Sequence, residues 1–545
     1  MAIQQIDLGT LTNQQAIKAD TESILAKLGN VAATVGTVRH ARVKTAANGA
    51  SLYFGDPKDA EINGLYTAFW SQTVIVRKNG SAPSSPTDGT VVLTNTTRNA
   101  YLETPFVDSA YTSGDVYRAF CYSTNGGINS STDGIFRSYV LYGFFCDETD
   151  ANENTAVHYL GDCANFARGY MDFANDRWEW GDWHGAFFHP SPCMLKTNGT
   201  VDYYLDPSNY KKKADGVTAS DVTDSSYDGN AMMEWSPVYV KIEKPSADSA
   251  GWYCWVSDVK VDENFECWSA KKADGTYAPH WYTAIYEGSV FSSKLRSLST
   301  DALPNCQTNA TNELTYARAN GTDYTPSTYA DEMLITLLGI LVTGRLNLQE
   351  SICGAYTSAS TRSIKCGSAD AKGPFYGVND GSYISNKMFG MENKFGHLWN
   401  RVVGCTLIDG EWYVKLTKST IDGSSVGDFV TSDTASAYAG YIATALTCPY
   451  GNPGYITQLG KSNIAAILPI RTGGTTTSYY CDGEYSTSGT RGVLLGGSLS
   501  NGLGAGRFAC AAGNAPSYSL WNYSASLSCK PFCGVARVNR PLPTT

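Results

Sequence analysis

The stretch Arg491-Gly-Val-Leu-Leu-Gly-Gly-Ser-Leu-Ser-Asn-Gly-Leu-Gly-Ala-Gly-Arg-Phe508, with Asn514-Ala-Pro-Ser-Tyr-Ser-Leu-Trp-Asn-Tyr523 after it, decides the fold of the C-terminal half. Its closely spaced glycines permit backbone conformations that other residues avoid, so the chain can turn tightly and hold the intervening side chains at fixed places. Four small or apolar residues are interpreted as scaffold that locks these turns to a core: Ala505, Phe508, Ala515 and Pro516. The pattern predicts irregular loops held on a rigid scaffold, which is where binding residues concentrate.

The side chains between these scaffold positions are of the kinds that binding surfaces favour. Tyr, Trp, Asn and Arg supply contact area and hydrogen bonds at low entropic cost. The candidate ligand-binding residues are Leu499, Asn501, Leu503, Arg507, Tyr518, Leu520, Trp521, Asn522 and Tyr523. Trp521 and Tyr523 are two apart on a predicted strand and are expected to share a face. The alternative for any one of the nine is internal packing.

Two stretches resemble a known group of folds. Gly390-Met-Glu-Asn-Lys-Phe-Gly-His-Leu-Trp-Asn-Arg-Val-Val-Gly404 is similar to a segment of the formylglycine-generating-enzyme group of C-type-lectin-like folds, with Gly396, Leu398 and Trp399 at the matching positions and His397 where Asn is common. The C-terminal stretch, closed by Leu527-Ser-Cys-Lys530 and Gly534-Val-Ala-Arg537, is similar to the ends of phage tail proteins. Some of those proteins are targets of diversity-generating retroelements, which rewrite this stretch.

The same resemblance raises the question of catalysis and metal binding. Enzymes of the group bind copper through a close Cys pair, but Gly506-Arg-Phe-Ala-Cys510 offers one Cys, and Cys529 and Cys533 have a different spacing. The six His form no evident triad, and Trp521-Asn522 is not followed by the Asp of calcium-dependent lectins. We therefore expect no enzyme activity, no cofactor and no metal, although a pair of carboxylates for glycan cleavage is not excluded by the sequence.

Composition narrows the class of protein. The chain has 545 residues, of which only 17% are charged, with a net charge of −10, so neither disorder nor nucleic-acid binding is expected. The N-terminus lacks a secretory signal, and the most apolar run, Met333 to Val342, is half the ~20 residues that a membrane span needs. The 15 scattered Cys are interpreted as buried thiols. These features predict synthesis in a cytoplasm, and the resemblance to phage tail proteins implies a bacterial host and assembly into a virion.

Residues 13–38 carry a heptad seam typical of a coiled coil. Its apolar or β-branched positions are Ile17, Thr21, Ile24, Leu28, Val31, Val35 and Val38. β-branched residues at both kinds of seam position favour three strands, which predicts a homotrimer. The alternative is an amphipathic helix that packs on its own chain.

The rest of the chain is expected to be β-rich, apart from a buried helix within 326–349 that is capped by Ser327 or Thr328. Residues 40–134 resemble a fibronectin type III sandwich, on the strands Thr73–Lys78, Thr90–Leu93 and Asp115–Tyr122, and are expected to act as a spacer. Residues 135–300 contain Trp178, Trp180 and Trp183, which we assign to core packing in preference to sugar stacking. Gly199–Leu205 and Trp235–Glu243 are each expected to be a strand.

Together these patterns predict a multidomain, β-rich α+β protein. Its segments are an attachment and trimeric coiled-coil segment (1–39), a fibronectin III/Ig-like β-sandwich (40–134), the β-rich N-terminal part of a head (135–300) and a C-type-lectin-like core with terminal ligand-binding loops (301–545). The resemblance implies a phage fibre or spike that binds a host-surface protein or glycan, contacts other virion proteins through its N-terminus, and inserts into no membrane. The alternative is a capsid or tail decoration fibre with a structural or general adhesive role.

Overall fold

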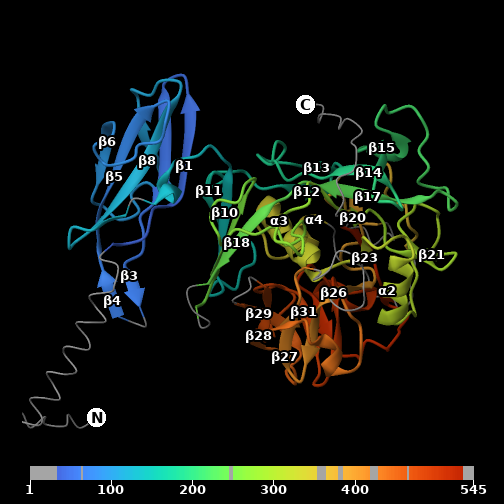
Figure 1. Ribbon diagram of the computed structural model, residues 1–545. Coiled ribbons are helices and arrows are strands. Elements are labelled where there is room, and N and C mark those ends of the chain that lie inside the picture. Colours follow the sequence, from blue (N-terminus) through green and yellow to red (C-terminus); the bar gives the residue numbers. More distant parts are fainter. Residues whose placement is uncertain are drawn as a thin grey trace, which may run out of the picture. The chain divides into compact units, whose positions relative to one another are not determined.

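The computed structural model describes residues 34–62, 65–129, 131–244, 249–352, 364–378, 385–417, 428–462 and 466–531. The described chain is β-rich with few helices and forms several sheets. It divides into two compact units, 1–140 and 141–545 (Figure 1). Most of the predicted coiled coil, residues 13–33, lies outside the described residues. Its last two seam positions, Val35 and Val38, are buried in the core of the first unit and belong to no described helix.

The first unit contains two antiparallel sheets that share one core. One sheet has the order β1 (Arg39–Ala46), β2 (Gly49–Gly55), β7 (Phe106–Asp108). The other has the order β6 (Thr90–Asn95), β5 (Trp70–Asn79), β8 (Asp115–Ser123), β9 (Ile128–Asn129). A short hairpin, β3 (Ala60–Ile62) and β4 (Leu65–Ala68), stands apart from both sheets. Apolar residues from β2, β5 and β8 meet in a single buried cluster, so the sheets face each other across it.

The strand predicted over Asp115–Tyr122 is confirmed as β8. Tyr117, Ala119 and Cys121 are at most 1% exposed and join the shared core, whereas Phe120 belongs to a separate cluster with Val74 and Val76 of β5. Successive side chains of a strand point to opposite faces, so both faces of β8 bury apolar groups.

In the second unit, a seven-stranded sheet joins distant parts of the chain. Its order is β16 (Asn209–Lys213), β15 (Val201–Asp206), β14 (Ser191–Lys196), β17 (Gly229–Trp235), β20 (Trp281–Ala284), β35 (Leu527–Cys529), β23 (Tyr324–Pro326). Strand β35 comes from the end of the described chain and lies between β20 and β23. Residues 141–300 and 301–531 therefore share this sheet and belong to one compact unit.

The expectation of one strand over Trp235–Glu243 is wrong. Strand β17 ends at Trp235, and β18 (Tyr239–Glu243) begins a different, four-stranded sheet with the order β11 (Val157–Gly161), β10 (Leu141–Cys146), β19 (Trp252–Ser257), β18. The break contains Pro237, which has no backbone N–H to donate to a ladder. The chain therefore changes sheets at this proline.

The terminal stretch belongs to a nine-stranded sheet. Its main path is β28 (Ile442–Thr447), β27 (Glu411–Val414), β26 (Trp399–Ile408), β32 (Arg491–Leu495), β33 (Cys510–Ala512), β31 (Gly483–Ser486), β29 (Gly454–Lys461), β30 (Ile467–Gly474). Strand β34 (Tyr523–Ser524) pairs in parallel with β26. Trp399 of β26 is 4% exposed and packs in the core.

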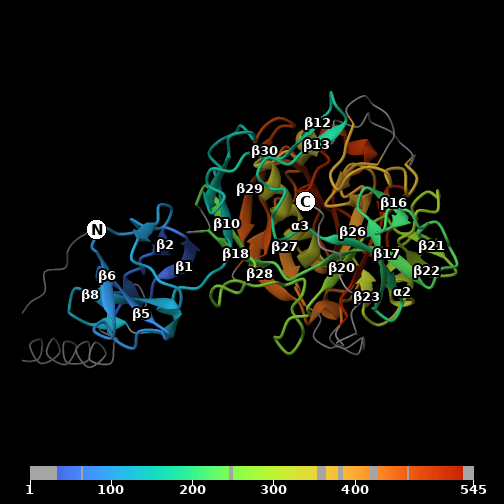
Figure 2. The same cartoon turned by 90° about the horizontal axis from the view of Figure 1, so that it is seen from above.

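Helix α3 (Tyr329–Thr343) is buried on every side in the interior of this unit (Figure 1, Figure 2). The side chain of Thr328 accepts a hydrogen bond from the Asp331 N–H, which confirms the predicted N-cap. The helix ends earlier than predicted because Gly344 takes a left-handed conformation (φ 60°). The short α4 (Leu348–Ile352) follows, and α2 (Ala310–Arg318) precedes.

Two general expectations can be compared with these residues. All thirteen cysteines of the described segments are free thiols, and all but the half-buried Cys306 are buried. Within the same segments, no helix is both long enough and apolar enough to cross a membrane. The remaining small sheets are the hairpins β12 (Tyr170–Asp172) with β13 (Arg177–Glu179), β21 (Ser289–Phe291) with β22 (Lys294–Arg296), and β24 (Lys387–Met388) with β25 (Met391–Glu392).

Candidate functional site

Eight of the nine candidate residues lie on two loops that leave and re-enter the nine-stranded sheet, and the ninth, Tyr523, begins β34. The first loop, residues 496–509, connects β32 to β33 and contains the 3-10 turn η3 (Leu499–Gly504). The second loop, residues 513–522, connects β33 to β34. Both loops are therefore fixed at each end by hydrogen-bonded strands.

The first loop is shaped by a local cap and by glycine. Ser498 donates from its backbone N–H and its hydroxyl to the Oδ1 of Asn501, both at 2.9 Å. Gly502 adopts φ 53° and ψ −130°, a conformation that L side chains rarely adopt. As a result Leu499 is fully buried beneath the turn, while Leu503 is 46% exposed. The Asn501 side chain is half-buried and accepts its hydrogen bonds from Ser498 of the same loop.

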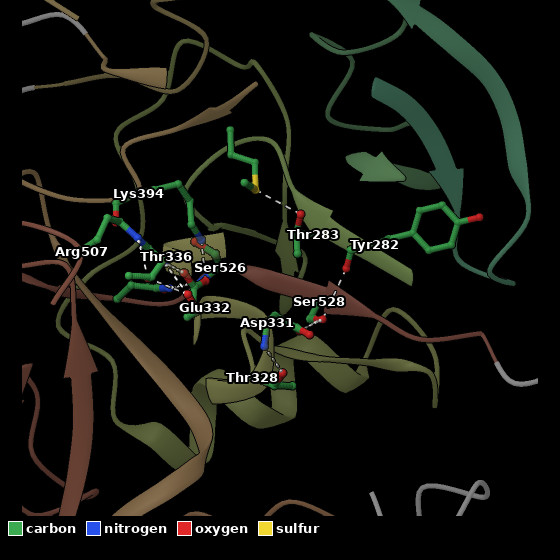
Figure 3. A network of polar contacts seen from close by, with 12 residues as sticks. Tyr282, Thr283, Thr328, Asp331, Glu332, Thr336, Lys394, Arg507, Ser526 and Ser528 are labelled. Atoms are coloured by element: carbon green, nitrogen blue, oxygen red, sulfur yellow. Dashed lines mark hydrogen bonds and ion pairs between the residues drawn. The ribbon is translucent and has the colours of Figure 1, made fainter. Parts of the chain in front are cut away.

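Arg507, expected to contact a ligand, is instead 3% exposed and anchors the first loop to α3 (Figure 3). Its Nη2 lies 2.8 Å from Glu332 Oε2, its Nη1 donates to the Lys394 carbonyl at 2.7 Å, and its Nε donates to Thr336 Oγ1 at 3.2 Å. A planar guanidinium offers five donors in a fixed fork, which suits this divergent set of acceptors. The binding assignment of Arg507 is corrected to a scaffold role.

Glu332 is the centre of this anchor. Lys394 Nζ lies 2.5 Å from Glu332 Oε1, and Asn400 Nδ2 donates to the same oxygen at 3.2 Å. Burial alone would raise the pKa of Glu332, but the charges of Lys394 and Arg507 outweigh it and lower the pKa to about 2. A cavity of about 40 Å³ adjoins the cluster, lined in part by Glu332, Thr336 and Arg507.

The residue before Glu332 holds the last described strand. Ser528 of β35 donates to Asp331 Oδ2 at 2.6 Å, and Lys530 Nζ lies 3.1 Å from Asp331 Oδ1 (Figure 3). The first turn of α3 thus ties down both the first loop and β35. Acidic residues in a first turn are common because of the helix dipole, but here they also serve tertiary contacts.

A second anchor comes from Asp482, next to β31. Its Oδ2 accepts the Phe508 N–H at 2.6 Å, and a Cβ at Gly506 would lie 2.0 Å from its Oδ1. Only glycine lets the backbone approach the carboxylate this closely. Burial raises the pKa of Asp482 to about 8, against the opposing effect of the backbone N–H groups.

The second loop is held by Arg401 of β26. Arg401 donates to the carbonyls of Pro516 at 3.3 Å and Tyr518 at 3.1 Å, and its Nε lies 3.3 Å from Glu313 Oε2. Burial raises the pKa of Glu313 to about 7, although the Arg401 charge opposes the shift. The Tyr518 side chain is 51% exposed above this attachment.

The end of the second loop turns inward. Leu520 packs against the cluster around Trp399, and Tyr523 is 6% exposed in β34, its hydroxyl accepting from Asn514 at 2.6 Å. Trp521 precedes β34 and is half-buried, so the predicted strand does not extend to it. Asn522 Nδ2 donates to Ser498 Oγ at 3.3 Å and joins the second loop to the first.

The nine candidates therefore separate by exposure. Two are exposed: Leu503 and Tyr518. Four are half-buried: Asn501, Leu520, Trp521 and Asn522. Three are interior: Leu499, Arg507 and Tyr523. The structure brings the two loops together, but it leaves the interior three without access to a ligand on the surface.

Two tyrosines beside the first loop were missed by the sequence analysis. Tyr485 of β31 is 37% exposed and packs edge-on against Trp399 with ring centroids 6.2 Å apart. Tyr455 of β29 is half-buried, and its ring lies 3.1 Å from where a Cβ of Gly504 would stand. We call Leu503, Tyr518, Tyr455 and Tyr485 the loop surface. Strand pairing, which a single sequence does not reveal, places the two tyrosines there.

The tryptophan cluster divides between core and surface. Trp183 is fully buried and contacts several rings, in agreement with core packing. Trp178 stacks on Phe375 with ring centroids 4.4 Å apart, and Trp180 packs edge-on against the same ring and against His189. Trp178 and Trp180 are half-buried, and the exposed Tyr170 (51%) lies on the same hairpin.

The described segments contain no group of three or more His, Cys, Asp or Glu side chains arranged to hold a metal ion. His397 is fully buried with its Nδ1 against Glu287 Oε2, and Asn393 donates to the same oxygen at 3.1 Å. His397, Glu287 and Asn393 are all buried in the interior of the second unit.

Comparisons with known proteins assign no family: the sequence matches no protein-family model and no curated protein.

Proposed function

We propose that this chain is a phage virion fibre protein that binds a receptor on the surface of its host bacterium through the loop surface. The observation that carries the proposal is the contrast within the terminal stretch. Buried ion pairs hold the backbone of both loops, while Leu503 and Tyr518 at their tips are about half exposed. Rigid loops with exposed aromatic and apolar tips lose little entropy on binding.

The character of the loop surface favours recognition over catalysis. Its exposed groups are apolar or phenolic, and Arg507, Asp482 and Arg401, which hold the loops, are buried. An exposed carboxylate beside the second loop, Asp433, accepts a hydrogen bond from the Ser517 N–H at 2.9 Å. A hydrolytic site would require solvent-accessible carboxylates on both sides of a bound sugar. Shape and aromatic contact are therefore the means of binding in this proposal.

The remaining parts fit a fibre. Two sheets of three and four strands around one core suit the fibronectin type III-like spacer proposed for 40–134. The second unit is proposed as an elaborated C-type-lectin-like head, and the heptads of 13–38 as the trimerising and attachment segment. Three heads would convert weak single contacts into avidity.

The test is binding of the fluorescently labelled full-length chain to a panel of bacterial strains, measured by flow cytometry. We expect saturable binding to a few related strains and none to the others. Equal binding to all strains would favour a general adhesive or decorative fibre, binding to none would refute receptor recognition, and release of reducing sugar from cell envelopes would indicate an enzyme.

A further inference from the structure

A groove lies at one end of the β29–β30 hairpin. Asn452, Tyr455, Arg471, Thr472 and Gly473 are among the residues that line it, and its volume is about 610 Å³. Ligand pockets commonly have volumes of ~300–1,000 Å³, so the groove is large enough for a small organic ligand. Its walls combine one aromatic ring, one cation, hydroxyl and amide groups, and glycine backbone.

Arg471 pairs with Gln458 in the β29–β30 ladder through its backbone, and its exposed side chain makes no hydrogen bond or ion pair with the described residues. Most arginines of the second unit contact a carboxylate or carbonyl, as Arg401 and Arg507 do. A guanidinium that faces a groove without a protein partner offers its fork of donors to an anionic group of a ligand.

The other groups of the groove suit a sugar. Thr472 Oγ1 donates to the Asn452 carbonyl at 2.7 Å, which fixes the rim of the groove. The Asn452 side-chain amide makes no hydrogen bond with the described residues and is exposed. Tyr455 contributes a half-buried ring, and an aromatic face complements the apolar face of a pyranose. A Cβ at Gly473 would meet no atom within 4 Å, so the backbone there is open to a ligand.

The groove adjoins the loop surface. Tyr455, which lines the groove, has its ring edge 3.1 Å from the position of a Cβ at Gly504 in the first loop. Tyr455 also pairs with Gly483 of β31, two residues before Tyr485. Tyr455 therefore belongs both to the lining of the groove and to the loop surface.

We propose that this groove binds an acidic unit of a bacterial surface polysaccharide, with Arg471 pairing the anionic group and Tyr455, Asn452 and Thr472 contacting the sugar. The inference rests on the proposed receptor-binding function and specifies its ligand as an anionic glycan. A carboxylate of a uronic acid and a phosphodiester of a teichoic acid both match a guanidinium, so the experiment must separate these two sources.

The test is biolayer interferometry of the full-length chain on three immobilised polymers: alginate for carboxylate, polyglycerol phosphate for phosphodiester, and dextran as the neutral control. We expect binding to one of the two anionic polymers, weakening with added salt, and none to dextran. Arg471→Gln should weaken that binding about tenfold or more, the usual effect of losing a charge-assisted hydrogen bond.

The matched control is Lys461→Gln, which removes a positive charge from the opposite end of the same hairpin. Equal losses in the two variants, equal binding to dextran, or no binding to either anionic polymer would overturn the proposal. Cell binding separates the two claims: if the chain still binds its strain and Arg471→Gln does not weaken that binding, the groove proposal fails while receptor recognition stands. If the wild-type chain binds no strain, receptor recognition itself fails.

Discussion

Replacing Glu332 by Gln should release the first loop from α3. The carboxylate is 1% exposed and faces two cations, with Lys394 Nζ at 2.5 Å and Arg507 Nη2 at 2.8 Å. Gln has nearly the same shape, so no cavity forms, but both cations lose their counter-charge in the interior. Lys394 is 5% exposed and Arg507 3%, so water does not replace the lost carboxylate.

Breaking a buried ion pair by removing one partner usually costs about 3–5 kcal/mol, because it leaves an unpaired buried charge. We expect a loss in this range from the free energy of unfolding of Glu332→Gln at pH 7. Because the pKa of Glu332 is lowered to about 2, the stabilising effect is present above the unfolded value near 4.5 and is lost as pH falls towards 2. The difference between wild type and variant should shrink over that interval.

The assay is urea unfolding followed by tryptophan fluorescence, which reports mainly the second unit because only Trp70 of the twelve tryptophans precedes residue 141. The control is Glu179→Gln, which breaks the exposed Arg177–Glu179 pair at 2.5 Å and should cost at most ~1 kcal/mol. Adding Lys394→Met to Glu332→Gln should recover part of the loss, since it removes one unpaired charge. Equal, small losses for Glu332→Gln and Glu179→Gln would refute the anchoring role.

Three further predictions follow from the same structure. Gly506→Ala should lower the free energy of unfolding in urea by about 1–3 kcal/mol, because the added Cβ would stand 2.0 Å from Asp482 Oδ1. The control Gly185→Ala should leave the free energy of unfolding unchanged, because no atom lies within 4 Å of its Cβ. Equal losses in the two variants would contradict the close approach of Gly506 to Asp482. Burial raises the pKa of the Asp482 carboxyl from 3.8 to about 8, so the folded state binds a proton at this carboxyl more tightly than the unfolded state does. The free energy of unfolding should therefore fall between pH 4 and pH 8, by up to ~1.4 kcal/mol per pH unit. Asp482→Asn should flatten this fall, and parallel curves of stability against pH for the variant and the wild type would refute the prediction. Light scattering should give three times the 58.7 kDa chain mass, and Ile24→Asp should give the single mass; a monomeric wild type would remove the coiled-coil trimer.

The sequence predicted helices and strands best where neighbouring residues determine them. The cap at Thr328 and the apolar run after it predicted α3, and the strand predicted over Asp115–Tyr122 is β8. The core role expected of Trp183 is confirmed, because large aromatic residues bury well.

The site was predicted less well because exposure depends on contacts between distant segments. Arg507 has the chemistry of a binding residue, and its burial follows only from its placement against Glu332, 175 residues earlier. Tyr455 and Tyr485 join the loop surface through the pairing of β29, β31 and β33, which local sequence does not determine. Strand β35 pairs with β20, which lies more than 240 residues earlier in the sequence. Local sequence therefore could not predict that residues 135–300 share a sheet with the C-terminal half.

The most direct test of the account changes the loop tips on the full-length chain and measures binding to the strain that the wild type recognises. The loop variant is Leu503→Asp with Tyr518→Ala, and the matched control is Val217→Asp with Tyr170→Ala, which alters an exposed apolar residue and an exposed tyrosine elsewhere in the same unit. All four side chains are at least 46% exposed, so both variants should unfold at the wild-type urea concentration. The account predicts that the loop variant loses cell binding and the control keeps it; binding that survives in the loop variant and disappears in the control would contradict the account and move the site to the tryptophan hairpin.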